Sequence, residues 1–207
     1  MLNEYYENTI KGNWVTSHSI FSAFIGEQKC LNDLSKHIFG VNLFNRTFEN
    51  ENRPKEFTFF FTPTLKNYNE FVLLLDKLIS ENINKDFFNG KIDLYEHIQL
   101  GDNLIERKPK GTLSLLQEWI LLKYNHPKDE IIKDLFKPLK KVRSDRQSPA
   151  HKISEDTFDK KFIDRQKVLI NDVYSSLRAL RTIFQQHPKA RGFEIPDWLD
   201  NGDIKTY

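Results

Sequence analysis

The chain has 207 residues, of which 39% are hydrophobic and 29% are charged, and its formal net charge is +2. A chain of this length can bury a sizeable core, either as one domain with an elaboration or as two small domains. The small net charge excludes a polybasic nucleic-acid coat protein, so any nucleic-acid site must come from local clustering of charge. The single cysteine, Cys30, excludes an intramolecular disulfide and agrees with a reducing compartment.

Neither a secretion signal nor a membrane span is expected. No amino-terminal stretch combines a basic region with an apolar one, as a signal peptide would. The longest apolar runs, such as residues 71–75, are far too short to span a bilayer. We therefore expect a cytoplasmic protein that does not enter the membrane.

The amino-terminal part predicts a helix followed by a β-hairpin. From residue 17 to residue 39, apolar side chains mostly recur at helical spacing, and Gly40 is a natural stop. Apolar and polar residues alternate over 41–48, and 56–62 is rich in Phe. With a turn at 49–54 between them, these two stretches are predicted to form the two strands of the hairpin.

Further helices are indicated along the middle of the chain. Thr64 is a suitable cap for a helix that ends near Asn82, and Thr112 caps a helix that reaches Tyr124. Between these two helices, a short helix is expected over 94–100, and the Gly- and Pro-containing stretches around it indicate loops.

Two long helices are predicted in the carboxy-terminal half. The first starts at Pro127, runs to about Val142 and should be kinked or locally opened by Pro138. The second covers about residues 158–186 and resembles the central helix of a bundle or one side of a helical dimer interface. Its expected buried positions are Phe162, Gln166, Leu169, Val173, Leu177, Leu180 and Phe184. In the tail from Pro188, Trp198 is expected to pack back on the core.

These elements predict a mainly α protein with a small amino-terminal α+β region that contains the hairpin. We divide the chain into an amino-terminal region (1–61), a helical domain (62–190) and a carboxy-terminal arm (191–207).

Between the two long helices lies the most informative stretch of the chain. From Lys133 to Lys152 there are seven Lys or Arg residues against two Asp. Pro149 disfavours continued helix, so Arg146 and His151 should meet at a break between helices. An Arg can hold a phosphate through two hydrogen bonds, and a His can move a proton near neutral pH. Together they suit cleavage of a phosphodiester.

The sequence Arg146-Gln-Ser-Pro-Ala-His151 resembles the R-x4–6-H motif of the HEPN superfamily. The resemblance covers roughly the second half of the chain and implies an HEPN-like helical bundle. It also implies a metal-independent endoribonuclease that acts as a homodimer, often as a toxin or phage-defence effector. In that reading Arg146 and His151 are catalytic, RNA is the substrate, no cofactor is needed, and an antitoxin or regulatory partner is a further expectation.

A second sequence, Arg181-Thr-Ile-Phe-Gln-Gln-His187, fits the same spacing. We prefer the first because it lies at a helix junction in a basic setting. Arg181 and His187 instead suit the last turn of a helix, where cations favour the helix dipole and Pro188 marks the stop.

The residues around the preferred motif have two readings each. The basic ones either follow the RNA backbone or form an ordinary solvated face; they are Lys140, Lys141, Arg143 and Lys152. Gln147 and Ser148 either orient the imidazole and contact ribose, or are simply turn residues. Asp145 either screens the neighbouring arginines or fixes Arg143 or Arg146.

Other chemistries find little support, because the chain has no close His pair at metal-ligand spacing, no C-x-x-C and no common nucleotide-binding or hydrolase motif. Two non-enzymatic alternatives stay open. One is a helical module that binds RNA or another protein. The other is a regulatory subunit whose amino-terminal hairpin senses a ligand.

Overall fold

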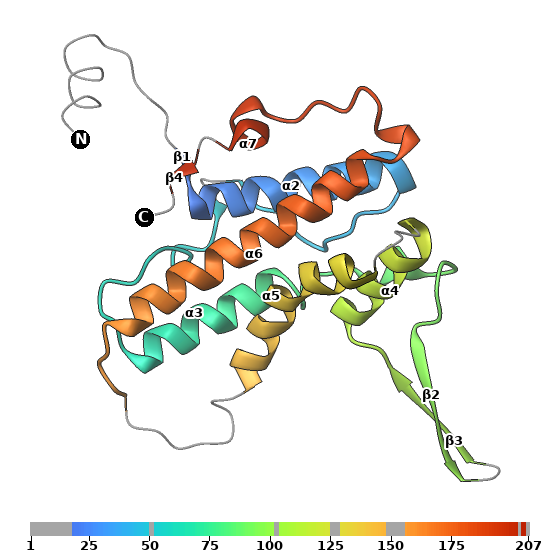
Figure 1. The fold of residues 1–207 in the computed structure, drawn as a ribbon, viewed down its shortest axis with the longest axis horizontal. Helices are drawn as coiled ribbons and strands as arrows, with labels where there is room; N and C mark the ends of the chain where they lie inside the picture. Colours follow the sequence, from blue (N-terminus) through green and yellow to red (C-terminus); the bar gives the residue numbers. More distant parts are fainter. Residues whose placement is uncertain are drawn as a thin grey trace.

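The computed structural model describes residues 18–49, 52–101, 104–124, 129–147, 156–202 and 204–205 (Figure 1). The helices of this described part are α2 (Ile20–Phe39), α3 (Leu65–Leu78), α4 (Thr112–Tyr124), α5 (Asp129–Gln147), α6 (Lys161–Gln185) and α7 (Asp197–Asn201). Two short 3-10 helices are η2 (Lys85–Phe88) and η4 (Pro188–Ala190). The strands are β1 (His18–Ser19), β2 (Tyr95–Gly101), β3 (Leu104–Pro109) and β4 (Ile204–Lys205).

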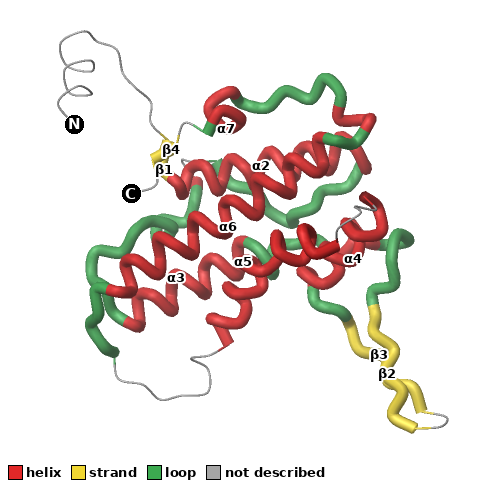
Figure 2. Tube along the Cα trace, in the orientation of Figure 1, coloured by secondary structure: helices red, strands yellow, loops and turns green. Residues whose placement is uncertain are grey.

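The long helix α6 is the centre of the fold. It lies beside α2 along much of its length, and α3 and α5 pack on its other side (Figures 1 and 2). All seven positions predicted to face the core are buried, namely Phe162, Gln166, Leu169, Val173, Leu177, Leu180 and Phe184. The periodicity of α6 therefore reports packing within one chain, as the bundle interpretation predicted.

The predicted helix-end roles of Gly40 and Thr64 are confirmed, whereas the predicted cap Thr112 is wrong, because Thr112 is the first residue of α4 and its hydroxyl donates a hydrogen bond to the Ser80 carbonyl. The Ser19 hydroxyl caps α2 by accepting a hydrogen bond from the Ser22 N–H, and Gly40 ends the helix in the left-handed region at φ 74°. The Thr64 hydroxyl caps α3 in the same way. In α5, Pro138 lies inside the helix, which bends part-way along its length in Figure 1.

The predicted hairpin over residues 41–62 is wrong, and with it the ligand-sensing hairpin of the regulatory-subunit alternative. This part of the chain is an irregular segment whose Phe44 and Phe57 side chains enter the core. Around Phe44 its backbone forms an isolated antiparallel bridge to Ile83, and other backbone groups bond to buried polar side chains. The Phe44 N–H donates to Asn32 Oδ1 and the Arg46 N–H donates to Asn82 Oδ1. The alternation of apolar and polar residues, which predicted strands here, therefore occurs in a segment whose described residues form no sheet.

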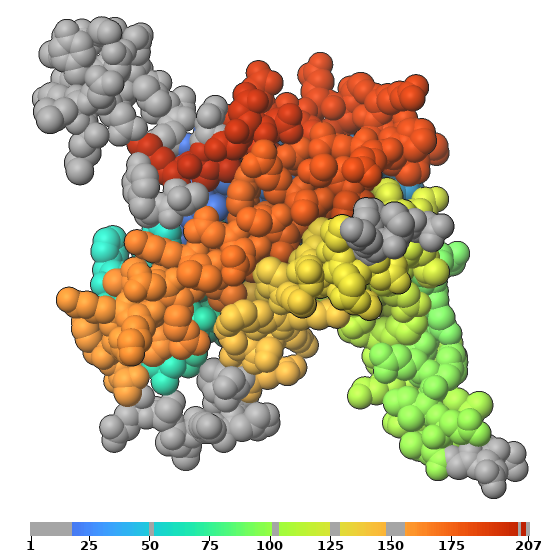
Figure 3. Space-filling model, in the orientation of Figure 1, coloured from blue at the N-terminus to red at the C-terminus, as the bar shows by residue number. Residues whose placement is uncertain are grey.

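The short helix predicted over 94–100 is also wrong, because β2 occupies this stretch and pairs antiparallel with β3. The two strands form a narrow arm that stands away from the helices (Figures 2 and 3). Pairing across the arm joins residues that no local spacing connects, such as Ile98 with Glu106, and the Arg107 guanidinium lies 4.1 Å from the centre of the Tyr95 ring.

The carboxy-terminal tail returns to the core, as predicted for Trp198. The Trp198 ring stacks on His18 with 3.8 Å between ring centres. It also passes so close to α2 that a Cβ on Gly26 would lie 2.9 Å from it. Gly26 is therefore tolerated inside α2 because it makes room for the indole.

The described chain is mainly helical with small two-stranded sheets, which confirms the coarse prediction of a mainly α fold. The division of the chain into three regions at residues 61 and 190 stays a prediction. One cluster of buried side chains contains residues from before and after residue 61. In the described part of the chain, no helix has the length and apolar character needed to cross a membrane.

A fully buried ion pair joins α6 to α2. The Arg181 side chain is 1% exposed and holds both oxygens of Glu27, with distances of 2.6 Å from Nε and 3.1 Å from Nη2. The remaining nitrogen, Nη1, donates to Gln185 at 2.8 Å and to Asp200 at 3.2 Å. Burial raises the pKa of the Glu27 carboxyl above its ordinary value, while the hydrogen bond and charge of Arg181 oppose that rise.

Replacing Arg181 should leave Glu27 as a buried carboxylate without its partner. We expect Arg181→Leu to lower the free energy of unfolding by about 3–5 kcal/mol at neutral pH. Loss of Arg181 raises the Glu27 pKa further, so the protonated form becomes the stable one in the fold. The destabilisation should therefore shrink below pH 4.5, the ordinary Glu value, and grow as the pH rises. Urea unfolding at several pH values measures both effects.

Thr182→Ala is the matched control, because Thr182 is the exposed neighbour of Arg181 on α6. It should change stability by less than about 0.5 kcal/mol. The double variant Glu27→Leu/Arg181→Leu should recover much of the loss, since it removes the unpaired charge. A destabilisation that is the same at every pH would contradict this account of Glu27.

Candidate functional site

Arg146 lies in the last described turn of α5, and the predicted helix break at Pro149 lies outside the described residues. The last residue of α5 is Gln147, which is exposed. The other half of the motif, Ser148 to His151, and Lys152 after it lie outside the described residues. The site is therefore built from the end of α5 and its neighbours.

Asp76 on α3 is the residue that holds the end of α5. Its side chain is 1% exposed, and its Oδ2 atom accepts hydrogen bonds from Nη1 of Arg146 at 2.5 Å and from Nη1 of Arg143 at 2.9 Å. Its other oxygen, Oδ1, accepts from the Ser80 hydroxyl. A buried carboxylate needs such partners, because desolvation of a charge without them is costly.

Glu81 completes the anchor of Arg146. Its Oε1 atom also bonds to Nη1 of Arg146, and it lies 3.9 Å from Nη1 of Arg143. Hydrogen bonds to Asp76 and then to Glu81 raise the pKa of the Arg146 guanidinium above its ordinary value. Arg146 is thus a permanent cation at a fixed position.

The anchor uses only one nitrogen of Arg146. Its Nε and Nη2 atoms make no hydrogen bond with any residue in the described part of the chain, and its side chain is 29% exposed. A guanidinium presents several donors in a planar fork, so these two remain able to bind an anion. Arg146 is therefore anchored through Nη1, while its other two nitrogens are available to a ligand.

The other basic residues of α5 divide between two settings. Arg143 shares Asp76 with Arg146 and is 45% exposed. Lys140 lies one turn earlier and donates to Gln117 at 2.5 Å. Lys141 instead pairs with Asp145 at 2.7 Å. Of the predicted RNA-binding residues that the structure describes, Lys140 and Arg143 are thus brought to one side, next to Arg146.

Asp145 does not fix Arg143 or Arg146, contrary to one reading of the sequence. It accepts hydrogen bonds from Lys141 and, at 3.3 Å, from the Tyr68 hydroxyl on α3. Asp145 lies next to Arg146 in sequence, but successive residues of a helix point in different directions. The carboxylates that hold the arginines come from the end of α3 and the segment after it.

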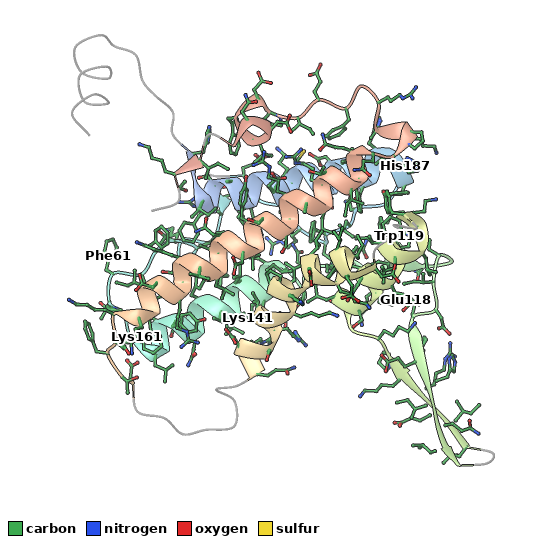
Figure 4. All side chains as sticks on the ribbon, in the orientation of Figure 1. Phe61, Glu118, Trp119, Lys141, Lys161 and His187 are labelled. Atoms are coloured by element: carbon green, nitrogen blue, oxygen red, sulfur yellow. The ribbon has the colours of Figure 1, made fainter. Side chains whose placement is uncertain are left out.

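The second R-x-H match has a structural role. Arg181 is enclosed by the buried ion pair with Glu27, and the His187 ring accepts a hydrogen bond from the Lys189 N–H at the start of η4. Burial, then the charges of Lys123 and Lys189, lowers the His187 pKa. In Figure 4, His187 lies at the opposite end of α6 from Lys161.

Sequence reasoning missed Asp76, Ser80 and Glu81 as parts of this site. A signal for the first was present, because Asp76 follows Val72 by four residues and precedes Ile79 by three. Both neighbours are buried, so the spacing places a carboxylate on the core-facing side of the helix. A charge at such a position predicts a buried ion pair, although it does not name the partner.

A cleft of about 840 Å³ opens beside the anchored arginines. Its walls come from Asn45, from residues 80, 81 and 83–86, from residues 111–114 at the start of α4, and from Lys140 and Arg143 on α5. Glu81 belongs both to this wall and to the Arg146 anchor. Among the described residues, no group of three or more His, Cys, Asp or Glu side chains is arranged to hold a metal ion.

Comparison of the chain with protein-family models, curated proteins and solved structures finds no match. The functional argument therefore depends on the site itself and on the motif.

The Asp76 anchor can be tested through stability. Asp76→Asn keeps the size of the side chain but removes the charge that binds Arg143 and Arg146. We expect it to lower the free energy of unfolding by about 1–3 kcal/mol, as measured by urea unfolding. Asp134→Asn is the control, since Asp134 forms only an exposed pair with Lys137 on α5 and should change little. Equal losses in the two variants would exclude Asp76 as the anchor.

Proposed function

We propose that the protein is a metal-independent endoribonuclease of the HEPN type, with Arg146 and His151 as its catalytic residues. The HEPN-like bundle is part of the same proposal. Support comes from the motif, from the helical architecture around it and from the state of Arg146. The observation that carries the proposal is that Arg146 is fixed through Nη1, while Nε and Nη2 have no hydrogen-bond partner among the described residues.

The free fork of Arg146 suits a scissile phosphate. Two parallel N–H donors match two phosphate oxygens, and a cation fixed in advance stabilises the charge that develops there. Because Asp76 holds the guanidinium from the buried side, little side-chain entropy is lost when the phosphate binds.

His151 supplies proton transfer in this mechanism. The ribose 2′-oxygen bonds to the adjacent phosphorus and loses its proton to a base, while the bond from phosphorus to the 5′-oxygen breaks and that oxygen gains a proton. The products are a 2′,3′-cyclic phosphate and a free 5′-hydroxyl. An imidazole with a pKa near the ordinary value of about 6.5 serves either step at neutral pH.

One protomer offers one such Arg–His pair, so we propose a homodimer whose two pairs form a composite cleft. The β2–β3 arm is the surface that favours self-association. Leu104 and Ile105 near its tip are 63% and 64% exposed. An isolated two-stranded hairpin is barely stable in water and its edges are unpaired. The arm and the carboxy-terminal end of α5 point toward the same side of the molecule in Figure 1, so one partner copy can reach both.

A second candidate function is a non-catalytic helical module that binds RNA or a protein. The double carboxylate contact of Arg146 favours it, because ion pairs with Asp76 and Glu81 are sufficient to explain why an Arg lies there. A toxin or phage-defence role, with an antitoxin or regulatory partner, is the biological setting that the motif suggests for the nuclease.

Cleavage of a mixed RNA pool in EDTA distinguishes the two functions. Wild type should cut and leave cyclic phosphate ends, because the mechanism needs no metal. His151→Ala should lose about 100- to 10,000-fold in rate while keeping its fold and its affinity for RNA. Arg146→Ala should lose both rate and affinity. Gel analysis of the products and of their end groups provides the measurement.

His187→Ala is the matched control, because it removes the histidine of the second R-x-H sequence. It should cut at the wild-type rate. No cutting by a well-folded dimer across varied RNAs, together with salt-dependent RNA binding, would favour the binding module.

The dimer can be tested on the arm. The double variant Leu104→Glu/Ile105→Glu should be monomeric in light scattering, because it buries charge in the proposed contact. Cleavage should fall with the dimer fraction. Val168→Glu on α6 is the control, since this side chain is 58% exposed and lies away from the arm. A strictly monomeric wild type that still cleaves RNA would end the composite-site idea.

A further inference from the structure

The cleft beside Arg146 has the size and lining of a ligand site. Its volume of about 840 Å³ lies within the usual range for small-molecule pockets. Ile83 and Leu113 supply an apolar part of the wall, while hydroxyl, amide and charged groups supply the rest. Such a mixed lining suits a ligand with both a flat apolar face and polar edges, and does not suit a purely apolar one.

Positive charge in the cleft comes from two separate elements. Lys140 and Arg143 project from α5, and Lys85 projects from η2. Two carboxylates, Glu81 and Asp86, also line the cleft. Glu81 is engaged by Arg146, and Asp86 accepts a hydrogen bond from Asn89 at 3.0 Å. The lining therefore has three cations against two carboxylates, of which Glu81 is paired with Arg146, while the cation Arg143 is paired with Asp76.

Lys85 is the cation of this cleft with the fewest structural contacts. It is exposed and makes no hydrogen bond or ion pair with any residue in the described part of the chain. Lys140 uses one of its three donors on Gln117, which leaves two. The Asn45 Oδ1 atom also has no partner among the described residues, because only the Nδ2 group of that side chain is bonded. The cleft thus offers both free donors and a free acceptor.

The cleft adjoins the proposed catalytic arginine through Arg143, although Arg146 itself does not line it. Arg143 lines the cleft and shares Asp76 Oδ2 with Arg146, so the two guanidinium groups meet at one atom. A nucleic acid whose phosphate lies on Arg146 must continue in some direction, and the cleft is the adjacent hollow that carries excess positive charge. Successive phosphates along a single strand favour such a track of cations.

We propose that this cleft binds the ribonucleotide next to the scissile phosphate. Lys85 and Arg143 hold its phosphate, Ser114 and Asn45 contact the ribose and base edge, and Ile83 and Leu113 face the base. This proposal rests on the proposed nuclease function, which identifies the phosphate on Arg146 as the one that is cleaved. Its test measures binding alone. The ligand chemistry is that of a nucleotide phosphate, whether it comes from RNA or from a free nucleotide.

The test changes Lys85, whose replacement disturbs no described contact. Affinity for a short fluorescent oligoribonucleotide of mixed sequence is measured by anisotropy in the His151→Ala protein, so that no cleavage occurs. Adding Lys85→Glu should weaken binding by about tenfold or more and make it less dependent on salt. Lys189→Glu makes the same charge change on η4, outside the cleft, and should bind like the parent.

Competition separates the two sources of the ligand. If adenosine monophosphate at millimolar concentration displaces the oligoribonucleotide from the parent but not from the Lys85→Glu protein, the cleft takes free nucleotides. If it does not compete, the cleft is a subsite for RNA. Thermal unfolding followed by circular dichroism verifies that each variant is folded.

Failure of this proposal and failure of the nuclease are distinguishable. Equal affinity in the Lys85→Glu and Lys189→Glu proteins overturns the cleft, whatever the wild type cleaves. Selective loss in the Lys85→Glu protein, combined with a wild type that never cleaves, retains the cleft as a binding site and rejects the nuclease. Absence of any RNA binding overturns both.

Discussion

The organisation of the candidate site depends on a single buried carboxylate. Asp76 lies between α3 and α5 with 1% of its side chain exposed, and it is bonded to two arginines and a hydroxyl. Burying a charge is unfavourable unless partners with good geometry replace water. The need to satisfy Asp76 therefore decides which way Arg143 and Arg146 point. Their remaining donors are directed to the surface, where the cleft and the end of α5 meet.

The two sequences that fit the R-x4–6-H motif differ in the burial of their arginines. Arg181 has every nitrogen engaged and is 1% exposed, so no donor is left for a ligand. Arg146 uses one nitrogen on the residues that the structure describes and is 29% exposed. Both sequences fit the spacing of the motif. The spacing does not show how many hydrogen-bond donors of each arginine are free. The structural arginine, Arg181, and the candidate catalytic one, Arg146, therefore differ in how many of their hydrogen-bond donors are available to a ligand.

What the sequence could predict followed from local physics. Caps, stops and periodicity depend on residues within one or two turns, so the stop at Gly40, the cap at Thr64 and the buried face of α6 could be predicted. The errors came from pairings that periodicity does not reveal. The Phe44 and Arg46 N–H groups donate to the side chains of Asn32 and Asn82, and β2 pairs with β3. In the site, Arg146 was readable because it ends a basic helix, but its anchors on and after α3 are about 65–70 residues away.

One face of α5 joins the anchor to the cleft. Lys140 and Arg143 are separated by three residues and so are Arg143 and Arg146, which puts all three on neighbouring turns of the same helix side. Such a row follows a chain of phosphates better than a compact anion, because each cation meets a different phosphate. Glu81 interrupts the row between Arg143 and Arg146. A ligand that binds along α5 must therefore compete with this carboxylate, and a polyanion with several contacts can do so where a single small anion cannot.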